Sequence, residues 1–336
     1  MVRRHAPRYL PHMLLASSDR FDIGPPPADL QRAALEWAFE SIGVPQRGSL
    51  VEQTLTAAAR GERSLDGLLA AWREHRVLGA VWSEIQPGDS AAVWPPQTSS
   101  EAPPALADEL LERALDRLAS KKVTMVQSLL LTDAGIDAAR FRRAGFDHPC
   151  DLLYLASSRP QFPTAPSGAD LQFAPIVPSA LDELAGLIEK TYQQTLDCPA
   201  LNGHQDCRQV VAGYRATCRD DLRNWFTVRH NDEAAGCLLL ADHARSQSWE
   251  LIYMGLVPVA RGRGWGIELV RQAQWLVRQQ GGERLLLAVD AANSPALRIY
   301  AAAGFMTCDR RSVFLKFLSR STEDGPPGPS SRTVTA

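Results

Sequence analysis

The run MGLVPVARGRGWGIELV contains three glycines at alternate positions, Gly262, Gly264 and Gly266. Arg261 precedes the first glycine, and Arg263 lies between the first and the second. The glycines follow an apolar segment and lead into an apolar pattern with helical spacing, which predicts a loop at the N-terminus of a helix. Unpaired backbone N–H groups gather there at the positive end of the helix dipole, and glycine allows close approach and positive φ angles. This loop is typical of phosphate or diphosphate binding, although a tight strand-to-helix turn would need the same glycines.

A dinucleotide site is one interpretation of this loop. Asp290 follows Gly266 by 24 positions, close to the offset of about 20 residues expected for a carboxylate that binds ribose. A dinucleotide-binding fold should continue with further strand–helix–strand units, however, and only 46 residues follow Asp290. Three predicted strands also precede the loop, which disfavours this interpretation.

A second motif, NSPALRIYAAAGF, occupies residues 293–305. With it, the sequence resembles the GNAT superfamily of acyl-CoA-dependent N-acetyltransferases over residues 170–318. The family's acyl-CoA loop, R/Q-x-x-G-x-G/A after V-x-P, is matched by Leu256, Pro258, Arg261, Gly264 and Gly266. Its N-x-x-A-x-x-x-Y-x-x-x-G-F segment is matched by Asn293, Ala296, Tyr300, Gly304 and Phe305.

The resemblance implies direct transfer of an acetyl group from acetyl-CoA, as co-substrate, to a primary amine in a ternary complex, without a metal. The backbone N–H groups of Arg261–Ile267, a segment that includes Trp265, would bind the diphosphate, and the pantetheine would lie between the splayed strands WELIYMGLV and RLLLAV. The N–H of Leu256 would hold the acyl carbonyl, near a β-bulge. Tyr300 would be the general acid, unless it is only a core aromatic.

Two further side chains complete the site that the resemblance implies. Glu250 lies six positions before Leu256, so strand alternation places both on one face. Glu250 would then remove the amine proton, or else be a solvated strand carboxylate. Asn293 would hydrogen-bond the pantetheine arm or cap the following helix.

The acceptor pocket is expected in the connection TYQQTLDCPALNGHQDC, residues 191–207, with Tyr192, Asp197 and His204 as candidate contacts. A zinc site from Cys198, His204 and Cys207 has a spacing that matches no common ligand pattern, so no metal is expected. Cys198 has no positioned base that the sequence can name, and direct transfer needs no nucleophilic side chain.

Composition places the chain among globular proteins of neutral charge. It has 336 residues, 45% hydrophobic and 22% charged, with a net charge of −2, which gives no overall attraction to nucleic acid or to an anionic membrane. The six cysteines are scattered without a CxxC pair, and no run approaches the ~20 apolar residues of a membrane span. We therefore expect a cytoplasmic protein whose partners are acetyl-CoA and a small-molecule or peptide amine, with no nucleic acid or membrane partner.

The second half of the chain predicts an α/β fold. Its pattern gives two helices, three strands, the glycine loop, then helix, strand, helix and strand, which is a mixed sheet with helices on its faces. The expected elements lie at residues 180–196, 206–220, 225–230, 236–243, 248–257, 267–280, 284–289, 294–303 and 312–317.

The first half repeats this late pattern. A shift of 159 positions places residues 108–118 on residues 267–277 and, without a gap, residues 140–146 on a segment that ends with Gly304 and Phe305. Two helices and the strand between them thus share one register, which favours duplication. The chain is therefore expected to hold two tandem GNAT folds, each with a mixed, mostly antiparallel sheet, in a layout similar to that of the mycothiol synthases.

The first copy is expected to be degenerate. Under the same shift, Arg261–Gly266 fall on Ala102–Ala107, which has no glycine and two prolines without N–H donors. Tyr300 falls on Phe141, which lacks the hydroxyl. Loss of the polar groups from one copy and their retention in the other favours an enzyme over the alternative, a non-catalytic acyl-CoA sensor or assembly protein.

Changes in composition suggest the domain boundaries. We expect an N-terminal extension at residues 1–20, the degenerate GNAT-like domain at 21–156, a linker rich in Ser, Pro and Gly at 157–170, the catalytic GNAT domain at 171–320 and a disordered tail at 321–336.

Overall fold

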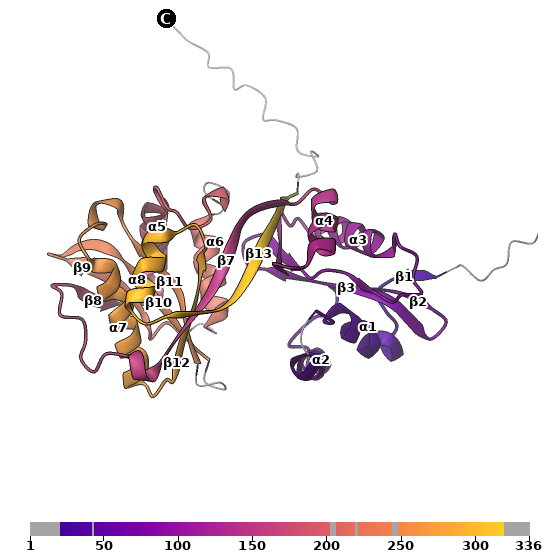
Figure 1. Cartoon of the computed structure of the whole chain (residues 1–336), viewed down its shortest axis with the longest axis horizontal. Helices are drawn as coiled ribbons and strands as arrows, with labels where there is room; N and C mark the ends of the chain where they lie inside the picture. Colours follow the sequence, from indigo (N-terminus) through magenta and orange to yellow (C-terminus); the bar gives the residue numbers. More distant parts are fainter. Residues whose placement is uncertain (1–20, 42–43, 202–205, 219–220, 244–247, 319–336) are drawn as a thin grey trace, which may run out of the picture. The chain divides into compact units, whose positions relative to one another are not determined.

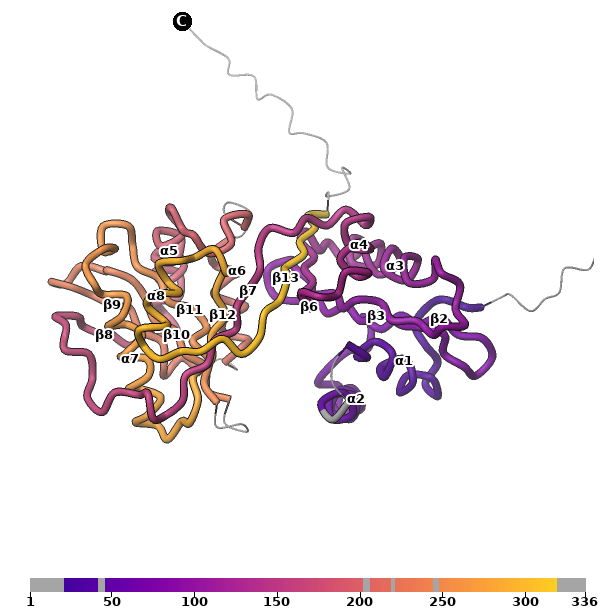
Figure 2. Tube along the Cα trace, in the orientation of Figure 1, coloured from indigo at the N-terminus to yellow at the C-terminus, as the bar shows by residue number. Residues whose placement is uncertain are grey.

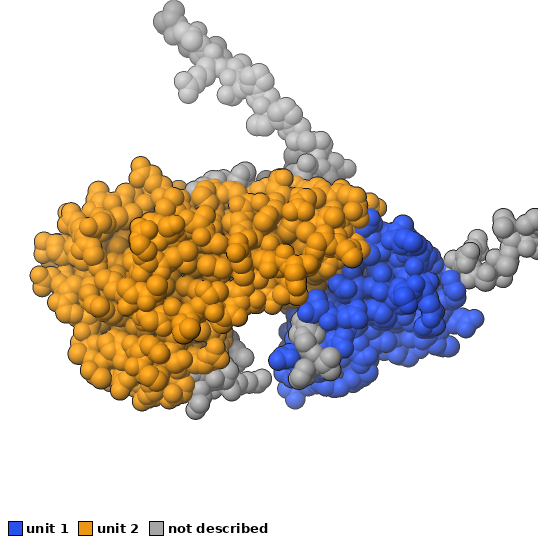
Figure 3. Space-filling view, in the orientation of Figure 1, with its two compact units in different colours: residues 1–82, 96–110 blue, residues 83–95, 111–336 orange. Residues whose placement is uncertain are grey.

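The computed structural model describes residues 21–41, 44–201, 206–218, 221–243 and 248–318 (Figure 1). The expected extension at residues 1–20 and the tail at 321–336 lie outside the described residues. Contacts between Cα atoms divide the chain into two units, one of Met1–Trp82 with Pro96–Leu110 and the other of Ser83–Pro95 with Leu111–Ala336 (Figure 3).

The first unit is a small sheet with two helices. β2 pairs antiparallel with both β1 and β3, and β5 pairs with β3. The ring of Phe39, which follows α1, packs edge-on against Trp82 with centroids 5.9 Å apart, and both side chains are fully buried. Its elements are β1 (Asp22–Gly24), α1 (Gln31–Ala38), α2 (Val44–Ala59), β2 (Leu68–Arg73), β5 (Gln97–Thr98) and most of β3 (Arg76–Gln86).

The second unit holds the whole second half of the chain and part of the first. Its helices are α4 (Gly135–Arg143), α5 (Leu181–Tyr192), α6 (Cys207–Thr217), α7 (Trp265–Gln279), α8 (Ser294–Ala302) and most of α3 (Leu106–Ser120). Its strands are β4 (Ser90–Val93), β6 (Met125–Leu131), β7 (Asp147–Ser158), β8 (Gln172–Pro175), β9 (Trp225–His230), β10 (Glu233–His243), β11 (Ser248–Leu256), β12 (Arg284–Asp290), β13 (Met306–Phe317) and the end of β3.

The element order predicted for the second half is confirmed, from α5 through β13. Strand β8, a four-residue strand paired with β9, was not predicted. The strands of the second unit lie in the order β3, β4, β6, β13, β7, β12, β11, β10, β9, β8. Most pairs are antiparallel, whereas β4 with β6 and β11 with β12 are parallel, so the sheet is mixed as expected.

The duplication is visible in the element bounds. Four consecutive elements of the first half, α3, β6, α4 and β7, begin and end 159 residues before α7, β12, α8 and β13. This is the register found in the sequence, now held by four elements, and it confirms the tandem arrangement. The segment Ala102–Ala107 stands where the second copy has its glycine loop.

The two copies exchange their last strands. β7, from the first copy, pairs antiparallel with β12 of the second, while β13, from the second copy, pairs with β6 of the first (Figure 2). β7 and β13 also pair with each other, and Leu152 lies opposite Arg311, its equivalent under the shift of 159. The exchange is therefore symmetric about this point.

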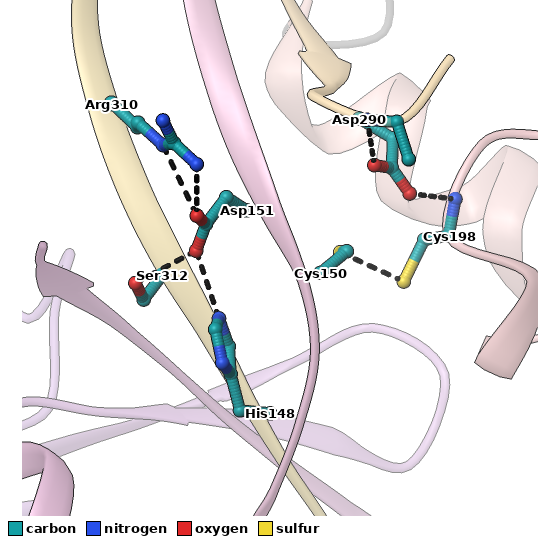
Figure 4. A network of polar contacts seen from close by, with 8 residues as sticks. His148, Cys150, Asp151, Cys198, Asp290, Arg310 and Ser312 are labelled. Carbon is teal, nitrogen blue, oxygen red and sulfur yellow. Dashed lines mark hydrogen bonds and ion pairs between the residues drawn. The ribbon is translucent and has the colours of Figure 1, made fainter.

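A polar network holds the exchanged strands together (Figure 4). Asp151 on β7 accepts hydrogen bonds from Nε of Arg310 at 3.1 Å and Oγ of Ser312 at 2.8 Å, both on β13, and its other contact is Nε2 of His148 at 2.8 Å. Partial burial opposes ionisation of Asp151, but the hydrogen bonds from Ser312, Arg310 and His148 hold its pKa below the ordinary value.

This exchange explains why the compact units do not follow the expected linker. β7 continues to Ser158, and Phe162 is buried in the core of the second copy, so the start of the segment 157–170 is packed structure. Tandem domains bounded as 21–156 and 171–320 remain our proposal for the duplicated halves, with β7 and β13 crossing between them.

The second copy buries a separate apolar cluster on each face of its sheet. Leu238 and Leu240 of β10 belong to the cluster that contacts α7 and α8. The alternate residues Cys237 and Leu239 belong to the cluster under α5 and α6. The period of two along β10 is that of a strand covered by helices on both faces.

Because β13 packs against the first copy, we expect Phe314→Ala to lower the free energy of unfolding. Phe314 on β13 is 1% exposed and packs against Phe141 of α4, with ring centroids 6.0 Å apart. Removing this ring leaves a cavity, so the free energy of unfolding should fall by about 3–5 kcal/mol, measured by urea denaturation. The matched variant Phe317→Ala, at an exposed position of the same strand, should lower it by less than about 1 kcal/mol. Equal effects of the two variants would show that β13 is not packed in this way.

Candidate active site

The candidate site is a cavity where β11 and β12 separate. The two strands pair in parallel at three positions, the last being Glu250 with Leu286, although β11 continues to Leu256 and β12 to Asp290. A cavity of about 440 Å³ lies at the separated ends. Its lining includes residues 251–256 of β11, 287–289 of β12, and side chains from the end of α5, α6 and α8. The splayed strands predicted from the sequence are therefore present.

A bulge in β11 changes which side chains face the cavity. Leu239 pairs with Tyr253 and Leu240 pairs with Leu251, so Ile252 is an extra residue on β11. Ile252 and Tyr253 both pack on the side of α5 and α6. The inserted residue reverses the alternation of side chains between the two faces of the sheet. Glu250 and Leu256, although six positions apart, therefore lie on opposite faces.

Glu250 lies apart from the cavity lining. One of its carboxylate oxygens is 3.0 Å from Nε2 of His243 on β10, and Glu250 is not among the residues that line the cavity. Leu256, the last residue of β11, does line it, and its carbonyl oxygen accepts a hydrogen bond from Arg261. The structure thus brings Leu256, and not Glu250, to the cavity.

The glycine loop leads directly into α7. Gly262 and Gly264 have φ angles of +75° and +78°, which favour glycine, and a Cβ at either position would meet no atom within 4 Å. Gly264 is the N-cap residue of α7, and no side chain caps the helix. The exposed loop therefore presents backbone N–H groups at a helix N-terminus to open space, as an anion site requires.

Arg261 has a structural role in this loop. Its guanidinium donates to three carbonyl oxygens, from Nε to Leu256 at 3.1 Å, from Nη1 to Gln194 at 3.2 Å and from Nη2 to Thr191 at 2.7 Å. These bonds tie the loop to the end of α5. The side chain that the motif supplies therefore fixes the shape of the site and leaves anion contacts to the backbone.

The other loop residues divide between surface and packing. The guanidinium of exposed Arg263 lies 5.1 Å from the ring centroid of Trp265, which also contacts His230 with centroids 4.7 Å apart. At Gly266 an added Cβ would come within 2.7 Å of Cδ1 of Ile299, so glycine permits close packing of α7 on α8. Ile267 packs against the core cluster under α7.

Helix α8 brings Tyr300 and Asn293 to the cavity. Tyr300 is 7% exposed, packs against Phe305 and lines the cavity, and its hydroxyl has no hydrogen-bond partner in the described part of the chain. Burial, with a smaller effect from Asp197, raises its pKa well above the ordinary value. Oδ1 of Asn293 accepts from the N–H of Ala296 at 3.3 Å, so Asn293 caps α8 while it also lines the cavity.

Three tyrosines that pack against one another form a wall of the cavity. Tyr253 stacks on Tyr214 with centroids 5.6 Å apart and meets Tyr192 edge-on at 5.9 Å. Oη of Tyr253 lies 2.7 Å from Oγ1 of Thr191, which itself donates to Ile188, so Tyr253 is the donor of this pair. Burial raises the pKa of Tyr192 to about 12, and it raises the pKa values of Tyr214 and Tyr253 well above the ordinary value.

Gly255 makes this wall possible. A Cβ there would lie 2.8 Å from both Oγ1 of Thr191 and Oη of Tyr253. Tyr192 was a predicted contact from the sequence, whereas Thr191, Tyr214 and Tyr253 were not. Tyr253 takes its place through the bulge, and no feature of the sequence reveals which way a bulged residue points.

Asp197 and Cys198 are fixed to the end of β12. The N–H of Cys198 donates to Oδ2 of Asp290 at 3.0 Å (Figure 4). The N–H of Asp290 in turn donates to Oδ1 of Asp197 at 3.0 Å. Burial raises the pKa of the Asp197 carboxyl, although the N–H of Asp290 opposes this. Asp290, the ribose-binding candidate of the dinucleotide interpretation, thus organises the cavity wall.

The remaining predictions concern His204, a metal site and membrane-spanning helices. His204 lies outside the described residues. Within the described ranges, no group of three or more His, Cys, Asp or Glu side chains could hold a metal ion. No helix in the same ranges is long and apolar enough to cross a membrane.

Residues 188–305 match the Acetyltransferase (GNAT) family model. Over this stretch the second half of the chain is similar to GNAT acetyltransferases. Both halves together resemble the GCN5-related N-acetyltransferase from Sphaerobacter thermophilus, with a TM-score of 0.64 at 16% identity over 89% of this chain and 96% of that one. The tandem GNAT protein from the clavulanic acid biosynthesis pathway gives a TM-score of 0.53 at 16% identity, covering 89% and 98%. These similarities establish the fold and its tandem layout.

Relatives by sequence match shorter stretches of this chain. Mycothiol acetyltransferase of Corynebacterium glutamicum is 36% identical over 67 residues, which are 20% of this chain and 23% of the relative. The chain spans half or less of the length of the curated relatives that it matches.

Proposed function

We propose that the second copy transfers an acetyl group from acetyl-CoA to a primary amine by direct attack in a ternary complex. The observation that carries this proposal is a cavity lined by Arg261 of the glycine loop and by Tyr300, a buried side chain whose hydroxyl has no hydrogen-bond partner among the described residues. The GNAT family match over residues 188–305 supports acyl transfer in general.

The residues present fit acetyl-CoA, which supplies an acetyl group activated as a thioester. The backbone N–H groups of Arg261–Ile267 would hold the diphosphate, since the loop is open and no side chain caps α7. The separated ends of β11 and β12 would hold the pantetheine, with Leu256 beside the acyl group and Asn293 donating through Nδ2, because its Oδ1 is already used as the cap of α8.

Tyr300 would hold the proton that the departing thiolate needs. Burial raises its pKa, so the hydroxyl remains protonated at neutral pH and can donate. A phenol with a raised pKa is a weaker acid in water, but a thiolate that forms in the same buried cavity is also poorly solvated, which favours the transfer. The equivalent residue in the first copy is Phe141, which cannot donate.

Asp197 is the carboxylate we assign to the acceptor amine. Asp197 lines the cavity, and its charge contributes to the raised pKa of Tyr300. The N–H of Asp290 donates to Oδ1 of Asp197, and Oδ2 takes no part in this bond. Glu250, by contrast, contacts His243 and does not line the cavity. Attack requires a neutral amine, so a carboxylate that binds the ammonium form and accepts its proton, directly or through water, would act at this point.

The first prediction tests the diphosphate loop with Gly264→Glu. The added carboxylate repels the diphosphate, and the positive φ angle at this position strains any residue with a Cβ and so disturbs the loop. Acetyl-CoA should therefore bind about 10- to 100-fold more weakly by calorimetry, a change of about 1.4–2.7 kcal/mol. The matched control is Gly281→Glu at the other end of α7, where φ is +77° and a Cβ would also meet nothing within 4 Å. If wild type does not bind acetyl-CoA or desulfo-CoA, both the enzyme and the sensor are excluded.

The second prediction tests the general acid with Tyr300→Phe. Loss of the hydroxyl should lower kcat about 10²–10⁴-fold, with acetyl-CoA affinity nearly unchanged, in a thiol-release assay across a panel of amines. Tyr154→Phe is the control, because Tyr154 is a partly buried tyrosine outside the cavity lining. An unchanged kcat would exclude Tyr300 as the acid. If acetyl-CoA binds and no amine releases thiol, the chain is a sensor instead.

The third prediction separates the two carboxylates by their pH profiles. A base acts when deprotonated, so wild-type kcat/KM should fall as pH falls through the pKa of Asp197, which burial has raised. Asp197→Asn cannot titrate and should lose this acidic limb together with most of the rate, whereas Glu250→Gln should retain the limb. The reverse pattern would assign the base to Glu250.

A further inference from the structure

Two cysteine sulfurs meet at the edge of the cavity wall. The S–H of Cys150 on β7 donates to Sγ of Cys198, and the two sulfurs are 3.3 Å apart (Figure 4). Both side chains are buried and both cysteines are free. Cys198 also lines the cavity, whereas Cys150 does not. The proposed acyl transfer uses neither thiol.

The surroundings hold this pair in place. Cys150 and Cys198 belong to one buried apolar cluster with Met125, Val313 and Leu315. The backbone of Cys198 has a φ of +40°, uncommon for a residue with a side chain, and the Asp290 carboxylate accepts its N–H. A conformation of this kind persists where the surrounding structure fixes it, so Sγ of Cys198 is directed at Cys150 by the fold.

We propose that Cys150 and Cys198 form a redox-active dithiol that a low-molecular-weight disulfide oxidises to an intramolecular disulfide. Disulfide sulfurs are about 2.05 Å apart, so closing the present gap needs little more than rotation of the two side chains. The bond would join β7, a strand of the first copy, to the cavity wall of the second. The site is chemically separate from acetyl transfer and does not depend on it.

The two thiols have different roles in this exchange. The hydrogen bond from Cys150 lowers the pKa of Cys198, while the same bond and burial raise that of Cys150. Cys198, reached through the cavity, attacks one sulfur of the reagent RSSR and releases RS⁻. Cys150 then loses its proton and attacks Sγ of Cys198, which releases the second RS⁻. The balance is two protein thiols and one RSSR to one protein disulfide and two RSH.

The test uses the full chain and bis(2-hydroxyethyl) disulfide as the reagent, without substrate. Peptide mapping of the wild-type protein should join Cys150 to Cys198, with the loss of two hydrogen masses from this pair of peptides. Cys207→Ser and Cys308→Ser are matched controls at more exposed cysteines and should behave as wild type. The disulfide should also raise the thermal unfolding temperature by several degrees, because it closes a loop of 48 residues.

Single variants test the assigned order of attack. Cys150→Ala should stop at a mixed disulfide on Cys198, with the mass of half the reagent added. Cys198→Ala should leave Cys150 unmodified, because its thiol is buried and has lost its partner. The proposal is overturned if wild type retains both thiols, if mapping finds another pairing, or if Cys150 reacts first. Mapping of the wild type needs no variant, so it decides the question even where a substitution prevents folding.

Discussion

The parting of β11 and β12 is the constraint from which the rest of the site follows. A parallel pair that ended together would fill this space with ladder hydrogen bonds and leave no cavity. Here the extra residue Ile252 turns the end of β11 away, and pairing stops at Glu250. The opening exposes residues 251–256 on one side and 287–289 on the other, and Arg261 of the glycine loop and Tyr300 of α8 line the same cavity.

Open strand ends must be held by other bonds, and the partly buried Arg261 and the buried Asp290 provide them. The guanidinium of Arg261 donates hydrogen bonds to three carbonyl oxygens. The Asp290 carboxylate accepts hydrogen bonds from the N–H groups of Cys198 and Ala292. Buried polar groups of this kind are costly unless they are paired, so each pairing fixes one geometry. The loop and the wall that contains Asp197 are therefore preorganised before any ligand arrives.

The fold was accessible from the sequence because its evidence is periodic. Helix α7, strand β12 and helix α8 show their spacing locally, and the offset of 159 revealed the duplication without any structure. The site was accessible only in part. The two motifs predicted the loop before α7 and drew attention to Tyr300, which lines the cavity, but an inserted residue in β11 places Glu250 and Leu256 on different faces. Bulges and strand exchange depend on contacts between distant segments, and no local pattern encodes them.

The exchange of β7 and β13 explains why the first copy is kept after losing its polar groups. Without β7, the edge of β12 would present unpaired N–H and C=O groups beside the cavity. Without β6, β13 would lose its partner on the side away from β7. The first copy thus completes the sheet on which the second copy builds its site, and this requires apolar strands and not a phosphate loop. The absence of glycine from Ala102–Ala107 therefore does not affect this role, which depends on the pairing of β7 with β12.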